Sequence, residues 1–212
     1  RSGKPLAQAA VKVAPGEWTK QHLTLQAVED ADSASLSIQT VTPGIYALDM
    51  ISLFPQKTFK NRPNGLRADL AQTIADLHPR FMRFPGGCLA HGDGVHNIYN
   101  WKETIGPLES RKPQRNLWGY HQTKGLGYYE FFQFCEDIQA EPVPVIAAGV
   151  CCQNSRGGGQ QGVAMCDMDA FVQDILDLVE YANGDASSKW GRMRAEAGHP
   201  EPFHLKYIGI GN

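Results

Sequence analysis

The stretch Phe81-Met82-Arg83-Phe84-Pro85-Gly86-Gly87 decides the fold. A short apolar run ends in a proline and two glycines, a pattern that predicts a buried strand running into a loop. Apolar residues at helical spacing occupy residues 66–77 before it, and Pro79 ends that helix. The chain therefore presents a helix followed by a strand, the unit from which parallel sheets are built.

The same unit recurs twice further along the chain. Helical spacing around residues 131–138 precedes an apolar strand at 143–148. A third helix begins at about residue 169 and closes at Asn183-Gly184, and a last strand covers residues 205–210. This alternation predicts an α/β fold with a parallel sheet. Three strands are fewer than the eight of a (β/α)8 barrel, so we expect residues 66–212 to form the first part of such a TIM barrel.

Residues 1–55 have a different pattern. Apolar and polar residues alternate over residues 23–27, 34–38 and 46–50, with turn signals between these runs. A period of two predicts strands with one face against a core and the other in water. Because a β-sandwich usually has seven or more strands, we expect only the C-terminal strands of one. Residues 56–65, rich in turn formers, are predicted to be the linker to the barrel.

Composition narrows the classes of partner. The formal net charge of −2 provides no basic face for nucleic acid, and no apolar run approaches the 18–20 residues that span a bilayer. The five cysteines include no C-x-x-C pair, and the histidines at 91 and 96 lack partners at zinc-site spacing, so we expect no metal and no cofactor. The start Arg1-Ser2-Gly3-Lys4 is not a signal peptide. The compartment stays open, secreted or periplasmic included, and so does a homo-oligomer.

Two strand ends carry residue types suited to chemistry, because the active sites of barrel enzymes lie where the strands end. Arg83 is suited to hold a carboxylate through a forked pair of hydrogen bonds. Asn212, after Gly209-Ile210-Gly211, is suited to donate and accept hydrogen bonds with a sugar hydroxyl. Each residue taken singly also fits a plain structural interpretation, namely a solvent ion pair for Arg83 and an ordinary turn for Asn212.

Four ordered motifs make a specific combination. They are Arg83-Phe84-Pro85-Gly86-Gly87, Trp101-Lys102-Glu103-Thr104-Ile105-Gly106-Pro107, Tyr129-Glu130-Phe131-Phe132-Gln133-Phe134-Cys135-Glu136 and Gly209-Ile210-Gly211-Asn212. Together they resemble glycoside hydrolase family 51, whose members are retaining α-L-arabinofuranosidases, with some endoglucanases among them. Residues 48–55 look like the last strand of the carbohydrate-binding-module-like sandwich that many members contain. The resemblance covers the chain from about Gly16 to Asn212.

The resemblance implies release of α-L-arabinofuranosyl residues from the non-reducing ends of arabinose-containing oligosaccharides or polysaccharides. In the family a general acid/base Glu directly follows the Gly-Asn pair, and the nucleophile Glu lies on a later strand. Asn212 is the last residue here, so we assign no catalytic residue within the chain. Because retention needs both carboxylates, these residues alone are not expected to hydrolyse glycosides. A family 51 endo-β-glucanase and a non-catalytic carbohydrate-binding protein stay open as alternatives.

The resemblance also implies accessory site residues. Asn212 would hydrogen-bond the 2-hydroxyl of the arabinofuranose, and Arg83 would orient the nucleophile. Cys88 would line the sugar pocket through its backbone. Trp118 would contact the leaving group, because sugar rings pack on indole faces. Trp101 is either a second wall of the pocket or part of the core.

Overall fold

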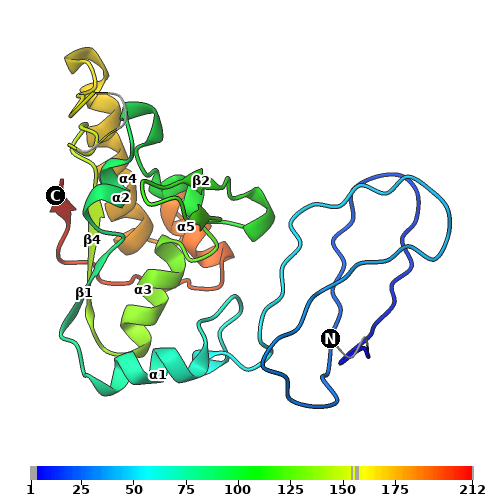
Figure 1. Ribbon diagram of the computed structural model, residues 1–212. Helices are drawn as coiled ribbons and strands as arrows, with labels where there is room; N and C mark the ends of the chain where they lie inside the picture. The colour runs from blue at the N-terminus through cyan, green and yellow to red at the C-terminus, as the bar shows by residue number, and fades with distance from the viewer. Residues whose placement is uncertain (1–3, 154, 156–157, 212) are drawn as a thin grey trace. The chain divides into compact units, whose positions relative to one another are not determined.

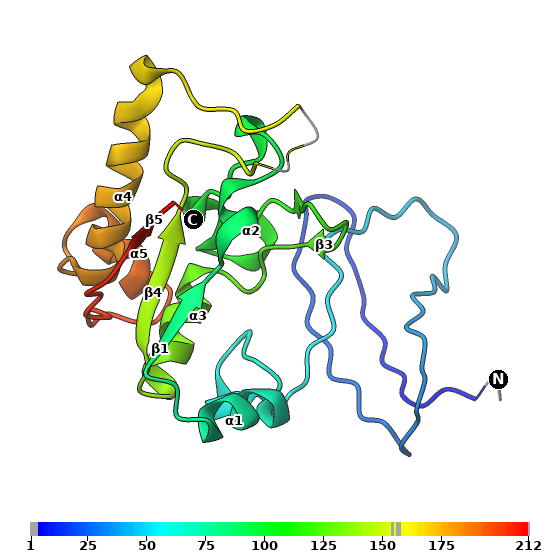
Figure 2. The ribbon, with the colours of Figure 1, turned by 60° about the vertical axis from the view of Figure 1, so that its left-hand side comes forward.

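A parallel sheet lies at the centre of residues 49–212 in the computed structural model, which describes residues 4–153, 155 and 158–211. β1 (Phe81–Phe84) pairs with β4 (Glu141–Ile146), and β4 pairs with β5 (Gly209–Ile210). All pairings are parallel, and the order β1-β4-β5 follows the chain (Figure 2). Parallel strands that neighbour each other in sequence order are the arrangement of a (β/α)8 barrel. The three predicted parallel strands are therefore confirmed, but the last covers only Gly209–Ile210 of the predicted residues 205–210.

Helices connect these strands and cover one face of the sheet (Figure 1). α1 (Ala68–Asp76) precedes β1, α3 (Tyr128–Asp137) leads into β4, and α4 (Met168–Asn183) follows β4. These three helices confirm the three that the sequence predicted, with boundaries that agree within a few residues. The shorter elements are η1 (Phe59–Asn61), α2 (Gly87–His91), η2 (Val95–Asn97), η3 (Trp101–Thr104), η4 (Leu108–Ser110), β2 (Gln114–Arg115), β3 (His121–Gln122), η5 (Met165–Asp167) and α5 (Lys189–Glu196).

The core lies between the sheet and the helices. Phe84 is buried and its ring packs on α3, with centroid distances of 4.5 Å to Phe131 and 5.6 Å to Phe132. Since side chains alternate along a strand, Arg83 points to the opposite face, and its side chain is exposed. Arg83 therefore lies on the face that a closed barrel encloses.

Helix α5 was not predicted, because its main anchor is a charged residue. The side chain of Arg194 is fully buried. Its guanidinium donates to the backbone carbonyls of Tyr181 at 2.6 Å and Gly184 at 2.8 Å, and also to those of His199 and Pro200. Hydrogen bonds to carbonyls satisfy a buried cation without an apolar stripe, so a search for helical periodicity misses this helix.

The chain divides into two compact units, of which Arg1–Leu48 is the first. Among its described residues, 4–48, no hydrogen-bonded strand forms at the runs predicted as strands. One backbone hydrogen bond, from Val28 N to Leu6 O at 2.9 Å, joins two segments of this unit that are far apart in the sequence. The apolar side chains of the alternating runs are exposed. Strands with one apolar face need a second layer to cover that face, and these residues provide none for each other.

Residues 56–65, predicted as a linker, pack within the second unit, Asp49–Asn212. Thr58 forms an isolated β-bridge with Arg67, and the buried Phe59 packs on Phe134 of α3 with ring centroids 5.8 Å apart. Within the described part of the chain, no helix combines the length and the apolar character needed to cross a membrane.

Candidate functional site at the carboxyl end of the sheet

Three segments meet where the strands end: residues 85–92 after β1, residues 147–152 after β4, and Gly211 after β5. The backbone N–H of Gly211 donates to Ile146 O at 2.7 Å, and that of Cys152 donates to Gly92 O at 3.1 Å. A Cβ built on Gly211 would lie 3.2 Å from the Cβ of Ala148. This rim, defined by the three segments, is the place where barrel enzymes carry their active sites.

Arg83 lies one residue before the end of β1. Its Nη1 lies 3.2 Å from the position that a Cβ on Gly86 would take, so the guanidinium turns toward the rim. Gly86 has a φ of 96°, a backbone conformation that also favours glycine. Asn212 lies outside the described residues, and Gly211 is the last position described. Because β4 separates β1 from β5, the ends of these two strands are about 10 Å apart.

Cys88 occupies α2, directly after the Gly86-Gly87 pair, and its side chain is half-buried. A hydrogen bond with the Cys152 thiol, together with burial, raises the pKa of Cys88. Cys88 is therefore a protonated thiol at neutral pH. The structure places Cys88 at the rim with Arg83, on the same connection after β1.

The two tryptophans lie in different surroundings. Trp118 is 58% exposed, in the turn between β2 and β3. Asn116 Oδ1 holds this turn by accepting from the backbone N–H groups of Trp118 and Tyr120, both at 3.0 Å. Trp101 is only 2% exposed, and its ring packs in the core at 5.2 Å from that of Trp190. The structure thus presents one indole to solvent and encloses the other among aromatic side chains.

The motif that starts at Trp101 anchors the long connection after β1. Trp101 Nε1 donates to the carbonyl of Asp174 in α4 at 3.0 Å. Lys102 Nζ donates to the Asp174 carboxylate at 2.5 Å and also to that of Asp177. The hydroxyl of Thr104 accepts from the backbone N–H of Tyr128 at 3.0 Å, which fixes the start of α3. These residues therefore hold the connection in place from the side of the helices.

His91 is a rim residue that the sequence did not single out for sugar chemistry. Its side chain is 4% exposed, and its Nε2 is buried with no hydrogen-bond partner. This nitrogen lies 3.7 Å from the position of a Cβ on Gly211, so it faces the end of β5. Burial lowers the pKa of His91, which keeps the imidazole neutral at neutral pH. From the sequence, this histidine was considered only as a possible zinc ligand, because its spacing indicates no other role.

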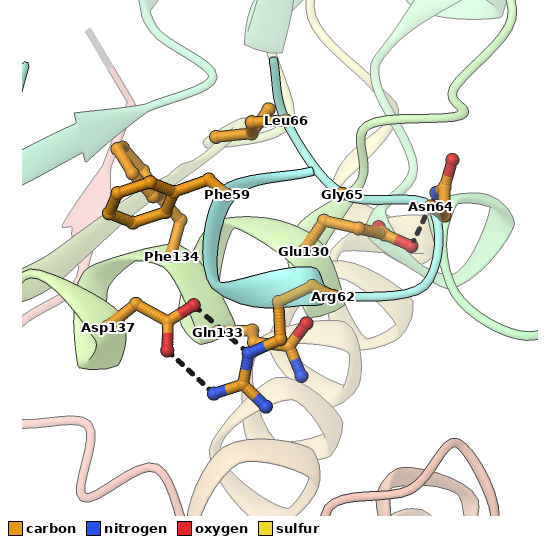
Figure 3. A pocket seen from close by; sticks show the side chains of 9 residues that line it. All are labelled: Phe59, Arg62, Asn64, Gly65, Leu66, Glu130, Gln133, Phe134 and Asp137. Atoms are coloured by element: carbon orange, nitrogen blue, oxygen red, sulfur yellow. Dashed lines mark hydrogen bonds and ion pairs between the residues drawn. The ribbon is translucent and has the colours of Figure 1, made fainter. Parts of the chain in front are cut away.

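A pocket lies away from the rim, between residues 59–66 and α3 (Figure 3). Arg62 binds Asp137 there through two hydrogen bonds of 2.6 and 3.1 Å, and Asn64 donates to Glu130 at 3.1 Å. The residues of α3 that line it, Glu130, Gln133, Phe134 and Asp137, are spaced along one side of that helix. Arg62 and Asp137 thus neutralise each other, Glu130 is paired with Arg111 from outside the pocket, and the described residues that line it include no predicted site residue.

No cluster of three or more His, Cys, Asp or Glu side chains suited to a metal ion occurs among residues 4–153, 155 and 158–211. The rim offers an arginine, thiols and an imidazole. Such groups are suited to bind and orient a polar organic molecule.

Comparisons with known proteins agree with this geometry. Residues 73–212 match the family model described as the alpha-L-arabinofuranosidase 1 domain. The chain is 43% identical to an extracellular exo-alpha-L-arabinofuranosidase of Streptomyces chartreusis, over 98% of this chain and 26% of the relative. It is 42% identical to alpha-L-arabinofuranosidase 1 of Arabidopsis thaliana, over 92% of this chain and 28% of the relative.

Solved structures give the same result. An arabinose-bound GH51 α-L-arabinofuranosidase superposes with a TM-score of 0.66 at 41% identity, over 73% of this chain and 24% of that protein. An arabinose complex of the α-L-arabinofuranosidase from Thermotoga maritima superposes with a TM-score of 0.53 at 29% identity, over 70% of this chain and 26% of that protein. These neighbours support an α/β fold with part of a TIM barrel. The chain spans about a quarter of the length of these relatives, and it belongs to glycoside hydrolase family 51, the family of these α-L-arabinofuranosidases.

Proposed function

We propose that the protein of which this chain forms a part is a retaining α-L-arabinofuranosidase that acts on the non-reducing ends of arabinose-containing oligosaccharides or polysaccharides. The observation that carries this proposal is the meeting of three strand ends at one rim, in a chain whose relatives are named α-L-arabinofuranosidases. The rim lies at the end of the sheet where a barrel enzyme binds its substrate.

The chemistry needs two carboxyl groups about 5 Å apart, one as nucleophile and one as acid/base. We assign neither group within this chain, and both are expected on strands that complete the barrel. The role proposed for Arg83 follows from its charge and its face of the sheet. A guanidinium on the enclosed face is suited to hold the nucleophilic carboxylate ionised and oriented.

The remaining accessory roles concern the sugar itself. We assign Asn212 to the sugar 2-hydroxyl, where a hydrogen bond that strengthens in the transition state accelerates the reaction. Cys88 is assigned to the wall of the sugar pocket, because it follows the Gly86-Gly87 turn at the rim. Trp118 is assigned to the leaving group, since its indole is open to solvent. Trp101 is left out of this set because it is enclosed in the core.

We further propose that residues 1–55 complete a carbohydrate-binding-module-like sandwich when the rest of the protein is present. The alternation of apolar and polar residues over residues 23–27, 34–38 and 46–50 supports this assignment. The apolar side chains of these runs are exposed in this chain, as expected when the covering sheet is contributed by other residues. Residues 56–65 would then lead into the barrel of residues 66–212.

The test is an assay of the longer protein on an aryl α-L-arabinofuranoside and on polymeric β-glucan. We expect turnover of the arabinofuranoside, with a first product of retained anomeric configuration, and no cleavage of β-glucan. A folded protein that cleaves β-glucan and leaves the arabinofuranoside intact would assign the endoglucanase activity instead. A folded protein that cleaves neither substrate would remove the proposed activity.

A further inference from the structure

The β2–β3 turn that carries Trp118 is joined to the rim through residues 92–97. At the rim, the carbonyl of Gly92 accepts from Cys152 N at 3.1 Å. A Cβ built on Gly92, whose φ is 72°, would lie 2.0 Å from the carbonyl oxygen of Asn97. Because any side chain at residue 92 would collide with this carbonyl, glycine is what allows the backbone of Asn97 to pack directly on the rim.

Asn97 holds strand β2 in two ways. Its backbone carbonyl accepts from Nε2 of Gln114 at 2.6 Å, and its side-chain Nδ2 donates to the carbonyl of Arg115 at 3.2 Å. The side chain is itself fixed, because Oδ1 accepts from the backbone N–H of Asp93 at 3.0 Å. Asn97 thus uses both the donor and the acceptor of its amide to join the segment after α2 to β2.

A buried charge adds a third connection to β2. The side chain of Asp93 is fully buried, and its carboxylate accepts from the guanidinium of Arg115, which is half-exposed. A buried carboxylate that loses its cation is strongly destabilising, so Asp93 favours the arrangement that keeps Arg115 beside it. β2 in turn pairs with β3 through Gln114–Gln122 and Arg115–His121. The whole hairpin is therefore attached to residues 92–97, and we call this set of contacts the rim link.

The rim link sets where the turn lies relative to the rim. Asn116 directly follows β2 and fixes the turn, because its Oδ1 accepts from the backbone N–H groups of Trp118 and Tyr120. The indole of Trp118 is exposed, so packing in the core does not determine its position. Displacement of β2 would therefore displace Trp118.

We propose that Asp93, Asn97 and Arg115 are positioning residues that act through Trp118. By fixing the β2–β3 turn relative to the rim, they set the preference of the enzyme for substrates whose leaving group is a sugar ring. This inference rests on the proposed function, because the assignment of Trp118 to the leaving group belongs to that proposal. Substrates whose leaving group has no ring do not depend on the rim link.

The rim link is tested without activity by hydrogen–deuterium exchange of the full natural protein. We expect N97A to speed the exchange of amides in residues 114–122 and to leave α5 unchanged. N97D keeps the acceptor for Asp93 N–H and removes the donor to β2, so it serves as a second variant in case N97A does not fold. K112A removes an exposed charge two residues before β2 and is the matched control. Unchanged exchange over residues 114–122 in the folded Asn97 variants would overturn the proposal.

The effect on specificity is measured with two substrates of the full protein. One is an arabino-oligosaccharide, and the other is methyl α-L-arabinofuranoside, whose leaving group has no ring. We expect N97A and R115A each to lower kcat/KM for the oligosaccharide by roughly 2- to 10-fold, the loss expected when an aromatic contact is removed, and to leave kcat/KM for the methyl glycoside unchanged. R115K keeps a cation beside Asp93 and should recover part of the loss. Equal losses on both substrates would overturn the proposal.

A double-mutant cycle decides whether the rim link acts through Trp118. We expect N97A/W118A to lose no more kcat/KM for the oligosaccharide than W118A alone, because the two residues contribute to one contact. Losses that multiply would assign the effect to another contact and overturn the proposal. Failure of the proposed function has a different signature, namely a folded wild-type protein that hydrolyses neither arabinofuranoside. That result would overturn the specificity role together with the proposed function, whereas equal losses in an active enzyme overturn this inference alone.

Discussion

Arg111 and Glu130 form a buried, two-pronged ion pair that joins the long connection after β1 to helix α3. Nη2 of Arg111 donates to Oε1 of Glu130 at 2.8 Å, and Nη1 donates to Oε2 at 3.0 Å. The side chains are 3% and 9% exposed. The same guanidinium donates to the carbonyl of Gly106 at 2.9 Å. Two of the family motifs, those containing Gly106 and Glu130, are thus held together by one arginine.

Replacing Arg111 by Met should destabilise the protein by about 3–5 kcal/mol, because it leaves the Glu130 carboxylate buried without its cation. Urea unfolding followed by circular dichroism measures this loss. The matched control is the double variant R111M/E130Q, in which the neutral amide keeps hydrogen-bonding capacity and removes the buried charge. We expect the double variant to be more stable than R111M. Equal stabilities would show that the buried charge is not the cause.

Lys102 links the same connection to α4, and replacing it should destabilise the protein by an amount that depends on pH. Burial raises the pKa of Asp177, but hydrogen bonds from Lys102 and Gln173 outweigh burial, so the net pKa is below its usual 3.8. A lowered carboxyl pKa stabilises the fold above pH 3.8, and this contribution is lost as the pH falls through the folded-state value. K102M should therefore lower the free energy of unfolding by about 1 kcal/mol at pH 7 and by less at pH 3. Urea unfolding at both pH values checks this, and an equal cost at both would contradict it.

Trp118 is assigned to the leaving group, and its neighbour Tyr120 supplies the control. Both side chains are exposed on the β2–β3 turn, and the backbone N–H groups of both are held by Asn116. Because stacking on an aromatic ring contributes about 0.5–1.5 kcal/mol, W118A should lower kcat/KM for an arabinofuranoside by roughly 2- to 10-fold. Y120A should change it less. Steady-state kinetics of the full protein measure both effects. A larger effect of Y120A would assign the contact with the leaving group to Tyr120 instead of Trp118.

His91 should make the stability of the protein fall at mildly acidic pH. Its folded-state pKa lies below 6.5 because of burial, whereas the unfolded chain protonates near 6.5. The unfolded state therefore binds more protons as the pH falls below 6.5, and stability decreases toward the folded-state pKa. H91Q has no titrating group at this position, so its stability should fall less steeply between pH 7 and pH 5. Parallel pH profiles for H91Q and the wild-type protein would show that His91 contributes nothing to this dependence.

Most of the sheet and three of its helices were predictable because each buries one apolar face. Phe84 in β1 and Phe132 in α3 belong to such faces, and they pack together in the core. Helix α5 was not predictable, because the buried guanidinium of Arg194 anchors it to backbone carbonyls. Helix α2 was predicted as loop, because its sequence begins with glycine and is only five residues long.

The candidate site was predictable only where it follows a strand end. Arg83 and Cys88 bracket the turn after β1, so the end of that strand predicts their place at the rim. His91 was missed because one buried imidazole leaves no periodic signal in the sequence.

The most direct test of the account is the activity of Arg83 variants of the full protein on an aryl α-L-arabinofuranoside. A guanidinium that orients the nucleophile contributes to the transition state, so R83A should lower kcat/KM by about 100-fold or more. R83K keeps the charge without the fork and should recover only part of that loss. Folded R83A enzyme with the kcat/KM of the wild-type protein would contradict the assignment of this rim as the sugar site.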